Sequence, residues 1–291
     1  MLAGLLMAFG WTRFVPASAL VALGLLAGCG QAEGHRLGGS VEKLDGVRDP
    51  DAAGGLRVGS CSSGADLELI DDMEDNNQSI SKIAGRSGSW FSFNDLTGSQ
   101  DPAMGGPTFK MSKTDPSRTG SQFNLRTSGS GFTDWGAGVG FDLATTEAYD
   151  ASRYTGIAFW ARVAPGTGTN LRFNVPDNNT SQYGGVCDLD CQPTVGPMGT
   201  NAPTEDGTCA PMRGPCYDDF GVDLLGKLSD GWQLFLFPWD ELSAKNWSGK
   251  NLPGVSKSAL YGVRFQANGP AAGQPPLTFD FSIDDVSLLC H

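Results

Sequence analysis

Histidine is almost absent from this 291-residue sequence: His35 lies near the start and His291 is the last residue. The long stretch between them lacks the imidazole groups used in Ser-His-Asp catalysis, Cys-His catalysis and many zinc sites. Basic residues are also scarce, with 20 Lys and Arg against 32 Asp and Glu and a net charge of −12. A nucleic-acid-binding protein needs a basic face to displace counterions from phosphates. The composition therefore excludes nucleic acid as a partner.

Long hydrophobic runs are missing except at the start of the chain. Residues 1–28 contain no acidic residue and one base, Arg13, followed by the apolar run 15–27. This run is too short to span a membrane comfortably and is typical of a signal peptide. Elsewhere the 41 glycines and the clusters of Asn, Asp, Ser and Pro predict many turns and argue against a helical bundle.

The signal peptide ends in the sequence LLAGC, residues 25–29, which resembles the bacterial lipobox. We therefore expect residues 1–28 to be a lipoprotein signal peptide and Cys29 to be lipidated. Residues 29–64, rich in Gly, Ser and Asp, would then be a flexible tether, and residues 65–291 the folded domain. The alternative is an ordinary secretory leader with a coincidental cysteine, and Met7 is a second candidate for the first residue.

Export and lipidation would anchor the protein in the cell envelope. Gly30 follows the cysteine, in place of the Asp that retains some lipoproteins at the inner membrane. This favours the outer membrane of a Gram-negative bacterium, with the lipid anchor as one partner of the protein.

The cysteine count fits an exported chain. Of the seven cysteines, six remain once Cys29 is assigned to the lipid, and an even number in an oxidising compartment predicts disulfides. We predict a Cys61–Cys290 bridge and two bridges, of open pairing, within the cluster of Cys187, Cys191, Cys209 and Cys216. A four-cysteine zinc site is the alternative, although the spacing of Cys209 and Cys216 is wider than the usual pair of zinc ligands.

Short segments of alternating apolar and polar residues recur from residue 65 onward. Aromatic and β-branched residues alternating with period two and separated by turns are typical of strands in a sandwich. The sequence therefore predicts an all-β fold, a two-sheet antiparallel β-sandwich. The expected strands are 89–94, 156–163, 171–175, 232–239, 261–266 and 279–283.

Three of these strands carry polar residues opposite their apolar side. The polar sets are Arg172 with Asn174, Arg264 with Gln266 and Asn268, and Asp280 with Ser282. If the three strands share a sheet, one face of the sandwich is polar but poor in Lys and Glu. Arg, Asn and Gln on such a face favour recognition of a hydroxyl-rich ligand, and an ordinary solvent-exposed face is the alternative.

An ordered set of motifs resembles the galactose-binding-like jelly-roll carbohydrate-binding modules, those of family 11 in particular. Residues 149–162 read YDASRYTGIAFWAR, and residues 283–288 read IDDVSL, like the closing strand of the family. The resemblance runs in the family's order from about residue 67 to 290, through segments 69–75, 89–95, 149–162, 231–242 and 283–288. It implies a non-catalytic domain that binds a polysaccharide.

The resemblance also implies a structural Ca²⁺ that ties the first strand to the last. The matching carboxylates are Glu74 and Asp285, with Asp72 as a third ligand. Asp285 shares its strand face with Ile283 and is expected to point inward, where an unpaired carboxylate is costly and a hard cation suits it. The alternative is that these acids cap turns in water.

For the sugar itself, the resemblance points to an aromatic platform beside planar polar groups. The candidate ligand-binding residues are Trp90, Arg172, Asn174, Arg264 and Gln266, with Tyr183 and Trp135 from loops. Trp160, Trp232 and Trp239 are expected in the core. Segment 184–217, which carries the four clustered cysteines, departs from the family as an insertion beside the binding side.

We therefore expect a monomeric, surface-anchored lipoprotein that binds a polysaccharide. A structural or adhesive envelope protein without sugar binding is the first alternative. A jelly-roll polysaccharide-degrading enzyme is the second, and it would need two carboxyls facing each other across a cleft. The acidic pairs of the sequence fall instead at expected strand ends and turns.

Overall fold

The computed structural model describes residues 56–106, 109–113, 118, 120–145, 147–167, 170–187 and 215–291. The strands within these residues form two sheets, and every strand pairing in them is antiparallel. The expected signal peptide, Cys29, most of the tether, Cys191 and Cys209 lie outside the described residues. No helix among the described residues is long and apolar enough to cross a membrane.

The seven-stranded sheet is organised around one long strand, β12 (Leu277–Leu289). β7 (Gly156–Val163) pairs along one side of β12, and β5 (Phe123–Phe132) and then β1 (Leu67–Asp71) pair along the other. The sheet is completed by β10 (Gln233–Pro238) beside β7, and by β3 (Ser99–Asp101) and β4 (Ser112–Lys113) beside β5.

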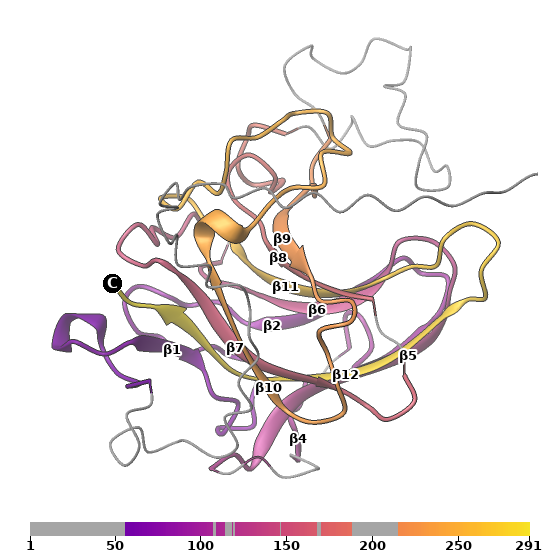
Figure 1. Ribbon diagram of the computed structural model, residues 1–291, viewed down its shortest axis with the longest axis horizontal. Helices are drawn as coiled ribbons and strands as arrows, with labels where there is room; N and C mark the ends of the chain where they lie inside the picture. The colour runs from indigo at the N-terminus through magenta and orange to yellow at the C-terminus, as the bar shows by residue number, and fades with distance from the viewer. Residues whose placement is uncertain are drawn as a thin grey trace, which may run out of the picture. The chain divides into compact units, whose positions relative to one another are not determined.

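The five-stranded sheet has the order β2-β6-β11-β8-β9. Figure 1 shows these strands in one layer and β7, β10, β12 and β5 in the other. Their bounds are β2 (Trp90–Asn94), β6 (Gly136–Asp142), β11 (Gly262–Asn268), β8 (Leu171–Val175) and β9 (Phe220–Asp223). The described residues also form two short 3-10 turns, η2 (Cys61–Ser63) and η4 (Trp239–Glu241).

The two sheets pack face to face through aromatic side chains. The ring of Phe159 on β7 lies 5.0 Å from that of Phe173 on β8 and 4.9 Å, edge to face, from that of Phe265 on β11. All three are fully buried, as expected where inward-facing residues of two sheets interdigitate. The expected all-β, two-sheet antiparallel sandwich is confirmed.

The three tryptophans expected in the core are buried, but in two places. Trp239 belongs to the main cluster between the sheets. Trp160 lies on the face of β7 opposite Phe159 and joins Trp232 and Leu234 in a smaller cluster. The seven-stranded sheet is therefore covered with apolar side chains on both faces near β7.

Residues just before β1, assigned to the tether by the sequence analysis, belong to the folded part. Val58 forms a bridge with Leu67, and the N–H of Gly59 donates to the carbonyl of Leu67 at 2.8 Å. Cys61 forms the expected disulfide with Cys290, which confirms that pairing. The described chain is therefore already packed on β1 by residue 58.

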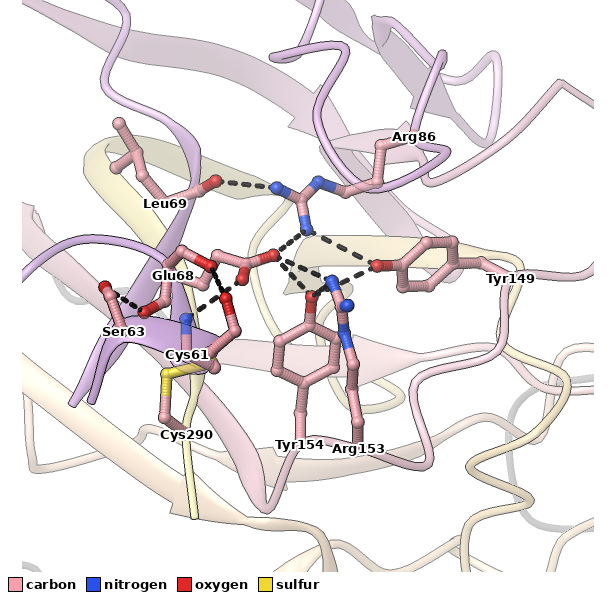
Figure 2. A network of polar contacts seen from close by, with 11 residues as sticks. Cys61, Ser63, Glu68, Leu69, Arg86, Tyr149, Arg153, Tyr154 and Cys290 are labelled. Carbon is pink, nitrogen blue, oxygen red and sulfur yellow. Dashed lines mark hydrogen bonds and ion pairs between the residues drawn. A yellow bond between two sulfur atoms is a disulfide. The ribbon is translucent and has the colours of Figure 1, made fainter. Parts of the chain in front are cut away.

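A buried polar network surrounds this entry point (Figure 2). Glu68 is 5% exposed and accepts hydrogen bonds from Arg86, Arg153 and Tyr154. Burial alone would raise the pKa of Glu68, but the hydrogen bonds from Tyr154 and the Cys61 N–H and the nearby guanidinium groups lower it below its usual value. Glu68 is therefore held as an anion that ties β1 to the loops around it.

Candidate functional site

The outer face of the five-stranded sheet is the candidate site. Directly opposed residues on neighbouring strands point to the same face of a sheet, so the pairing registers define this face. One row across the sheet is Phe91, Gly140, Arg264, Asn174 and Gly221, and the next is Phe93, Gly138, Gln266, Arg172 and Asp223. We call these two rows the outer face.

Four predicted ligand-binding residues come together on the outer face. Arg264 is directly opposite Asn174, and Gln266 is directly opposite Arg172. Asp280 and Ser282 do not join them, because β12 lies in the other sheet. The polar face expected from the sequence therefore exists, but it is built from two of the three expected strands.

Arg172 and Asn174 are covered, which differs from the expected wet surface: they are 7% and 5% exposed. The Arg172 guanidinium donates to Asn174 Oδ1 at 2.8 Å, to the Ser243 carbonyl at 2.6 Å and to the Asp219 carbonyl at 3.4 Å. These bonds attach the chain before β9 and after η4 to the sheet. The two side chains therefore point to the outer face but are covered by these segments.

Arg264 and Gln266 remain partly exposed. Arg264 donates to Asp219 at 3.3 Å, and its guanidinium lies 5.7 Å from the ring centre of Tyr217. Gln266 donates from Nε2 to the carbonyl of Trp135 at 3.1 Å. Both side chains are thus held in place while part of each still faces solvent.

Trp90, the predicted platform residue, lies in the core instead, at 2% exposure. Its indole N–H donates to the buried carboxylate of Asp71 at 2.6 Å, and its ring packs against Phe141 at 4.6 Å. A buried indole needs a partner for its N–H, and Asp71 supplies one here. The prediction that Trp90 faces the ligand is therefore wrong, because the structure reverses the two sides of β2.

Phe91 and Phe93 consequently take the outward positions and are partly exposed. The ring of Phe93 stacks on that of Trp135 with a centroid separation of 6.1 Å and an interplanar angle of 22°, and it lies 6.1 Å from the ring of Phe91. A Cβ on Gly138 would come within 2.6 Å of the Phe93 ring, so the glycine allows that ring to lie over β6. We call Phe91, Phe93 and Trp135 the aromatic strip. Of these three residues only Trp135 was predicted to bind the ligand, although alternation about a buried Trp90 places Phe91 and Phe93 on the outward side of β2.

Tyr217 lies beside Arg264, and Tyr183 and Tyr261 form an aromatic pair. Tyr183 and Tyr217 are 48% and 39% exposed. The Tyr183 ring lies 6.1 Å from that of Tyr261, whose hydroxyl donates to the Tyr183 carbonyl at 3.1 Å. The predicted loop residue Tyr183 is therefore an exposed aromatic, and Tyr217 is a second one that was not predicted from the sequence.

The three predicted calcium ligands bond to protein donors. Glu74 Oε1 accepts the N–H groups of Gln122 and Phe123, Asp72 Oδ1 accepts the N–H of Glu74, and Asp285 Oδ2 accepts from Arg118 at 2.6 Å. No group of three or more His, Cys, Asp or Glu side chains in the described part of the chain is arranged to hold a metal ion. These contacts do not form a cation-binding set, and the calcium site stays a prediction.

The expected inward direction of Asp285 is altered by a bulge. The pairing of β12 with β7 shifts register between Asp284 and Ser287, and Asp285 has a positive φ of 44°. A bulge moves the following side chains to the opposite face. Val286, rather than Asp285, is therefore the next residue after Ile283 that is buried in the core. Asp284, at 0% exposure, is the fully buried carboxylate of the pair.

Burial raises the pKa of Asp71, the partner of Trp90, from its ordinary 3.8 to about 6. Between these values the native state binds a proton that the unfolded chain does not, so this group's contribution to stability falls as pH rises from 4 to 6. Two pKa units correspond to about 3 kcal/mol. Relative to Asp71→Asn, the wild type should lose about that much unfolding free energy between pH 4 and pH 7 in urea titrations. If the unfolding free energies of the two proteins changed in parallel with pH, this pKa assignment would be contradicted.

No protein-family model matches the sequence, and no curated protein matches it. Among solved structures, the chain is similar to the family 11 carbohydrate-binding module of the cellulosomal cellulase Lic26A-Cel5E of Clostridium thermocellum. The identity is 14% over 77% of this chain and 95% of that one, with a TM-score of 0.40.

Two further solved structures are carbohydrate-binding modules of the same organism. The family 11 module in complex with a β-1,3-1,4-mixed-linked tetrasaccharide is 12% identical over 74% of this chain and 96% of that one, with a TM-score of 0.37. The family 30 module of the cellulase Cel9D-Cel44B is 11% identical over 69% of this chain and 91% of that one, with a TM-score of 0.40.

Proposed function

We propose that the β-sandwich binds a polysaccharide on the outer face of its five-stranded sheet and performs no catalysis. The aromatic strip carries this proposal: Phe91, Phe93 and Trp135 are partly exposed beside Arg264 and Gln266 on the same sheet face. The C–H-rich faces of sugar rings stack on aromatic side chains, and planar polar groups bond to the hydroxyls. Family 11-like motifs in the sequence support the same function.

The charges around the outer face favour a neutral polysaccharide. Arg264 is paired with Asp219, and both Arg172 and Lys245 are paired with Asp223, at distances of 3.1 to 3.4 Å. Because these cations already have carboxylate partners, a uronic acid would have to compete for them. The overall charge of −12 also opposes an acidic polymer.

Single substitutions in the aromatic strip test the proposal. In a screen of purified full-length protein against soluble glycans, Phe93→Ala and Trp135→Ala should each weaken binding by about tenfold or more, as expected for aromatic anchors. The mixed-linked β-1,3-1,4 tetrasaccharide is the first probe.

The matched control is Leu236→Ala, an exposed apolar residue on β10 of the other sheet, which should leave affinity within about twofold. Wild-type binding that survives both strip substitutions would place the binding surface elsewhere. Absence of binding across plant, fungal and bacterial glycans would favour the structural or adhesive envelope protein.

We further propose that Cys29 is lipidated and holds the sandwich at the outer membrane, supported by the LLAGC sequence at residues 25–29. Labelled palmitate should enter the wild-type protein and not Cys29→Ala. Incorporation into the variant would overturn this assignment.

Structural calcium also remains a proposal, supported by the acidic residues Asp72, Glu74 and Asp285 of the first and last motifs. Asp285 Oδ2 already accepts from Arg118 at 2.6 Å, so an ion at that oxygen would compete with the guanidinium. Calcium should raise the melting temperature and a chelator should lower it. A melting temperature that neither changes would overturn the proposal.

A further inference from the structure

We propose that the Cys187–Cys216 disulfide positions a second aromatic part of the polysaccharide site, in which Tyr217 is a ligand-stacking residue. We call Tyr183 and Tyr217 the aromatic wall. This inference rests on the proposed function and extends it to the segment around the disulfide, which the family-like motifs do not include. Cys187 and Cys216 are bonded, 29 residues apart in sequence, and both are buried. Each is close in sequence to an exposed tyrosine, Tyr183 or Tyr217.

The disulfide fixes the backbone that carries the two tyrosines. The Tyr217 N–H donates to the carbonyl of Thr180 at 2.8 Å, which joins the segment after Cys216 to the segment before Cys187. Tyr217 has a positive φ of 73°, a conformation that a non-glycine residue adopts at a cost unless its surroundings impose it. The covalent bond and the hydrogen bond together impose it here.

The next two residues attach this wall to the sandwich. The Asp218 carboxylate accepts the N–H groups of Lys245 and Ser248, each at 3.0 Å, and is 2% exposed. Asp219 pairs with Arg264 of the outer face, and burial raises the pKa of Asp219 while Arg264 lowers it. The Tyr217 ring is thereby placed beside the Arg264 guanidinium, with 39% of the residue exposed.

The wall stands across the sheet from the aromatic strip. Phe91 is on β2 and Arg264 on β11, with β6 between them, so their backbones are about 10 Å apart at two strand spacings. A polysaccharide that stacks on the strip at one end can therefore reach Arg264 and Tyr217 at the other. The site would bind several sugar residues along a line that crosses the strands.

Two variants test the wall at the level of affinity. With the mixed-linked β-1,3-1,4 tetrasaccharide as the first probe, and otherwise with the soluble glycan that scores in the screen, Tyr217→Ala and the double variant Cys187→Ser/Cys216→Ser should each weaken binding by about tenfold. Tyr217→Phe keeps the ring and should bind within about twofold of the wild type. The matched control is Cys61→Ser/Cys290→Ser, which removes the second disulfide found among the described residues and should retain the wild-type affinity at a temperature where the variant is folded.

Amide hydrogen exchange tests the positioning without a glycan. The Tyr217 amide should be protected in the wild type and exchange at least about tenfold faster in Cys187→Ser/Cys216→Ser, whereas amides of β7 and β12 should stay protected. Near-UV circular dichroism checks that the core is folded in each variant.

The outcomes separate the two proposals. If the wild type binds a glycan and the Cys187→Ser/Cys216→Ser and Tyr217→Ala variants bind it equally well, the wall is overturned and the proposed function stands. If the wild type binds no glycan, both are overturned. Unchanged exchange of the Tyr217 amide in the double variant would overturn the positioning role of the disulfide.

Discussion

Replacing both Cys61 and Cys290 with serine is expected to lower the free energy of unfolding by about 5 kcal/mol. The disulfide joins residues 229 positions apart, so it closes almost the whole folded part into one loop. A cross-link over so long a loop removes much of the freedom of the unfolded chain, and this effect grows with loop length. The predicted loss is therefore large even though both cysteines lie at the edge of the sandwich.

The local contacts of the bridge act in the same direction. The Cys61 N–H donates to Glu68 Oε2 at 3.2 Å, and Thr155 Oγ1 donates to the carbonyl of Cys290 at 3.0 Å. Figure 2 shows the disulfide beside the buried carboxylate of Glu68 and its ring of donors. Without the bridge, the chain before β1 would be free to leave this network.

Unfolding in guanidinium chloride under non-reducing conditions measures this loss. The slope of the unfolding free energy against denaturant concentration is determined for each protein as well. The control is Cys187→Ser/Cys216→Ser, whose bridge spans 29 positions and should contribute about 2 kcal/mol less by the same dependence on loop length. Equal losses for the two double variants would contradict the loop-length argument. A steeper slope for the long-loop variant would instead reveal a more expanded unfolded state.

The fold followed from the sequence because alternation in the strands is local. The apolar residues of 156–163 and 171–175 mark strands that the structure places at β7 and β8 with the same bounds. The Cys61–Cys290 pair was also predictable, since these two cysteines bracket the domain while the other four cluster. Such features depend on spacing along the chain and need no knowledge of distant contacts.

The sides of individual strands were harder to predict. Alternation in β2 shows that Trp90 and Phe91 face opposite ways, but not which of them is inside. The deciding contact is between Trp90 and Asp71, which are 19 residues apart. Similarly, the bulge at Asp285 changes the direction of the side chains after Ile283, and nothing in the local pattern of residues 279–288 announces it.

The candidate site was predicted only in part for the same reason. Arg264 and Gln266 were identified because their strand alternates cleanly. Arg172 was identified on the same grounds, but it is buried by residues near positions 219 and 243. Whether an outward-facing residue meets solvent depends on which loops fold over it, and period-two alternation carries no information about that.

Arg118→Met is expected to lower the free energy of unfolding by about 3–5 kcal/mol, because it leaves the buried carboxylate of Asp284 without a cation. Arg118 is 5% exposed and donates from Nε and Nη2 to Asp284 Oδ2, at 3.1 and 2.8 Å. Its guanidinium also lies 5.0 Å from the ring centre of Trp160. The substitution removes the cation while keeping an apolar chain of similar length over Trp160.

An exposed pair of the same chemistry is the matched control. Arg126 and Asp280 form a bidentate ion pair, but the Arg126 side chain is 54% exposed. Because solvent screens such a pair, Arg126→Met should cost at most about 1 kcal/mol. The difference between the two methionine variants, measured by urea unfolding at one pH, isolates the effect of burial.

The loss at Arg118 should also depend on pH. Burial and the neighbouring charge of Asp285 raise the pKa of Asp284, and Arg118 opposes this rise in the wild type. In Arg118→Met the pKa of Asp284 should rise further, so the native variant takes up a proton that the unfolded chain releases near pH 4. The loss of unfolding free energy in Arg118→Met relative to the wild type should therefore be larger at pH 8 than at pH 5.

Removing the second charge completes the test. If the loss comes from the uncompensated carboxylate of Asp284, Arg118→Met/Asp284→Asn should be more stable than Arg118→Met alone at pH 8, because the fully buried charge is removed and only the partly buried Asp285 loses its cation. If it comes only from lost packing on Trp160, adding Asp284→Asn should give no recovery and the deficit should not change with pH. The sign of the coupling in this double-mutant cycle decides between the two causes.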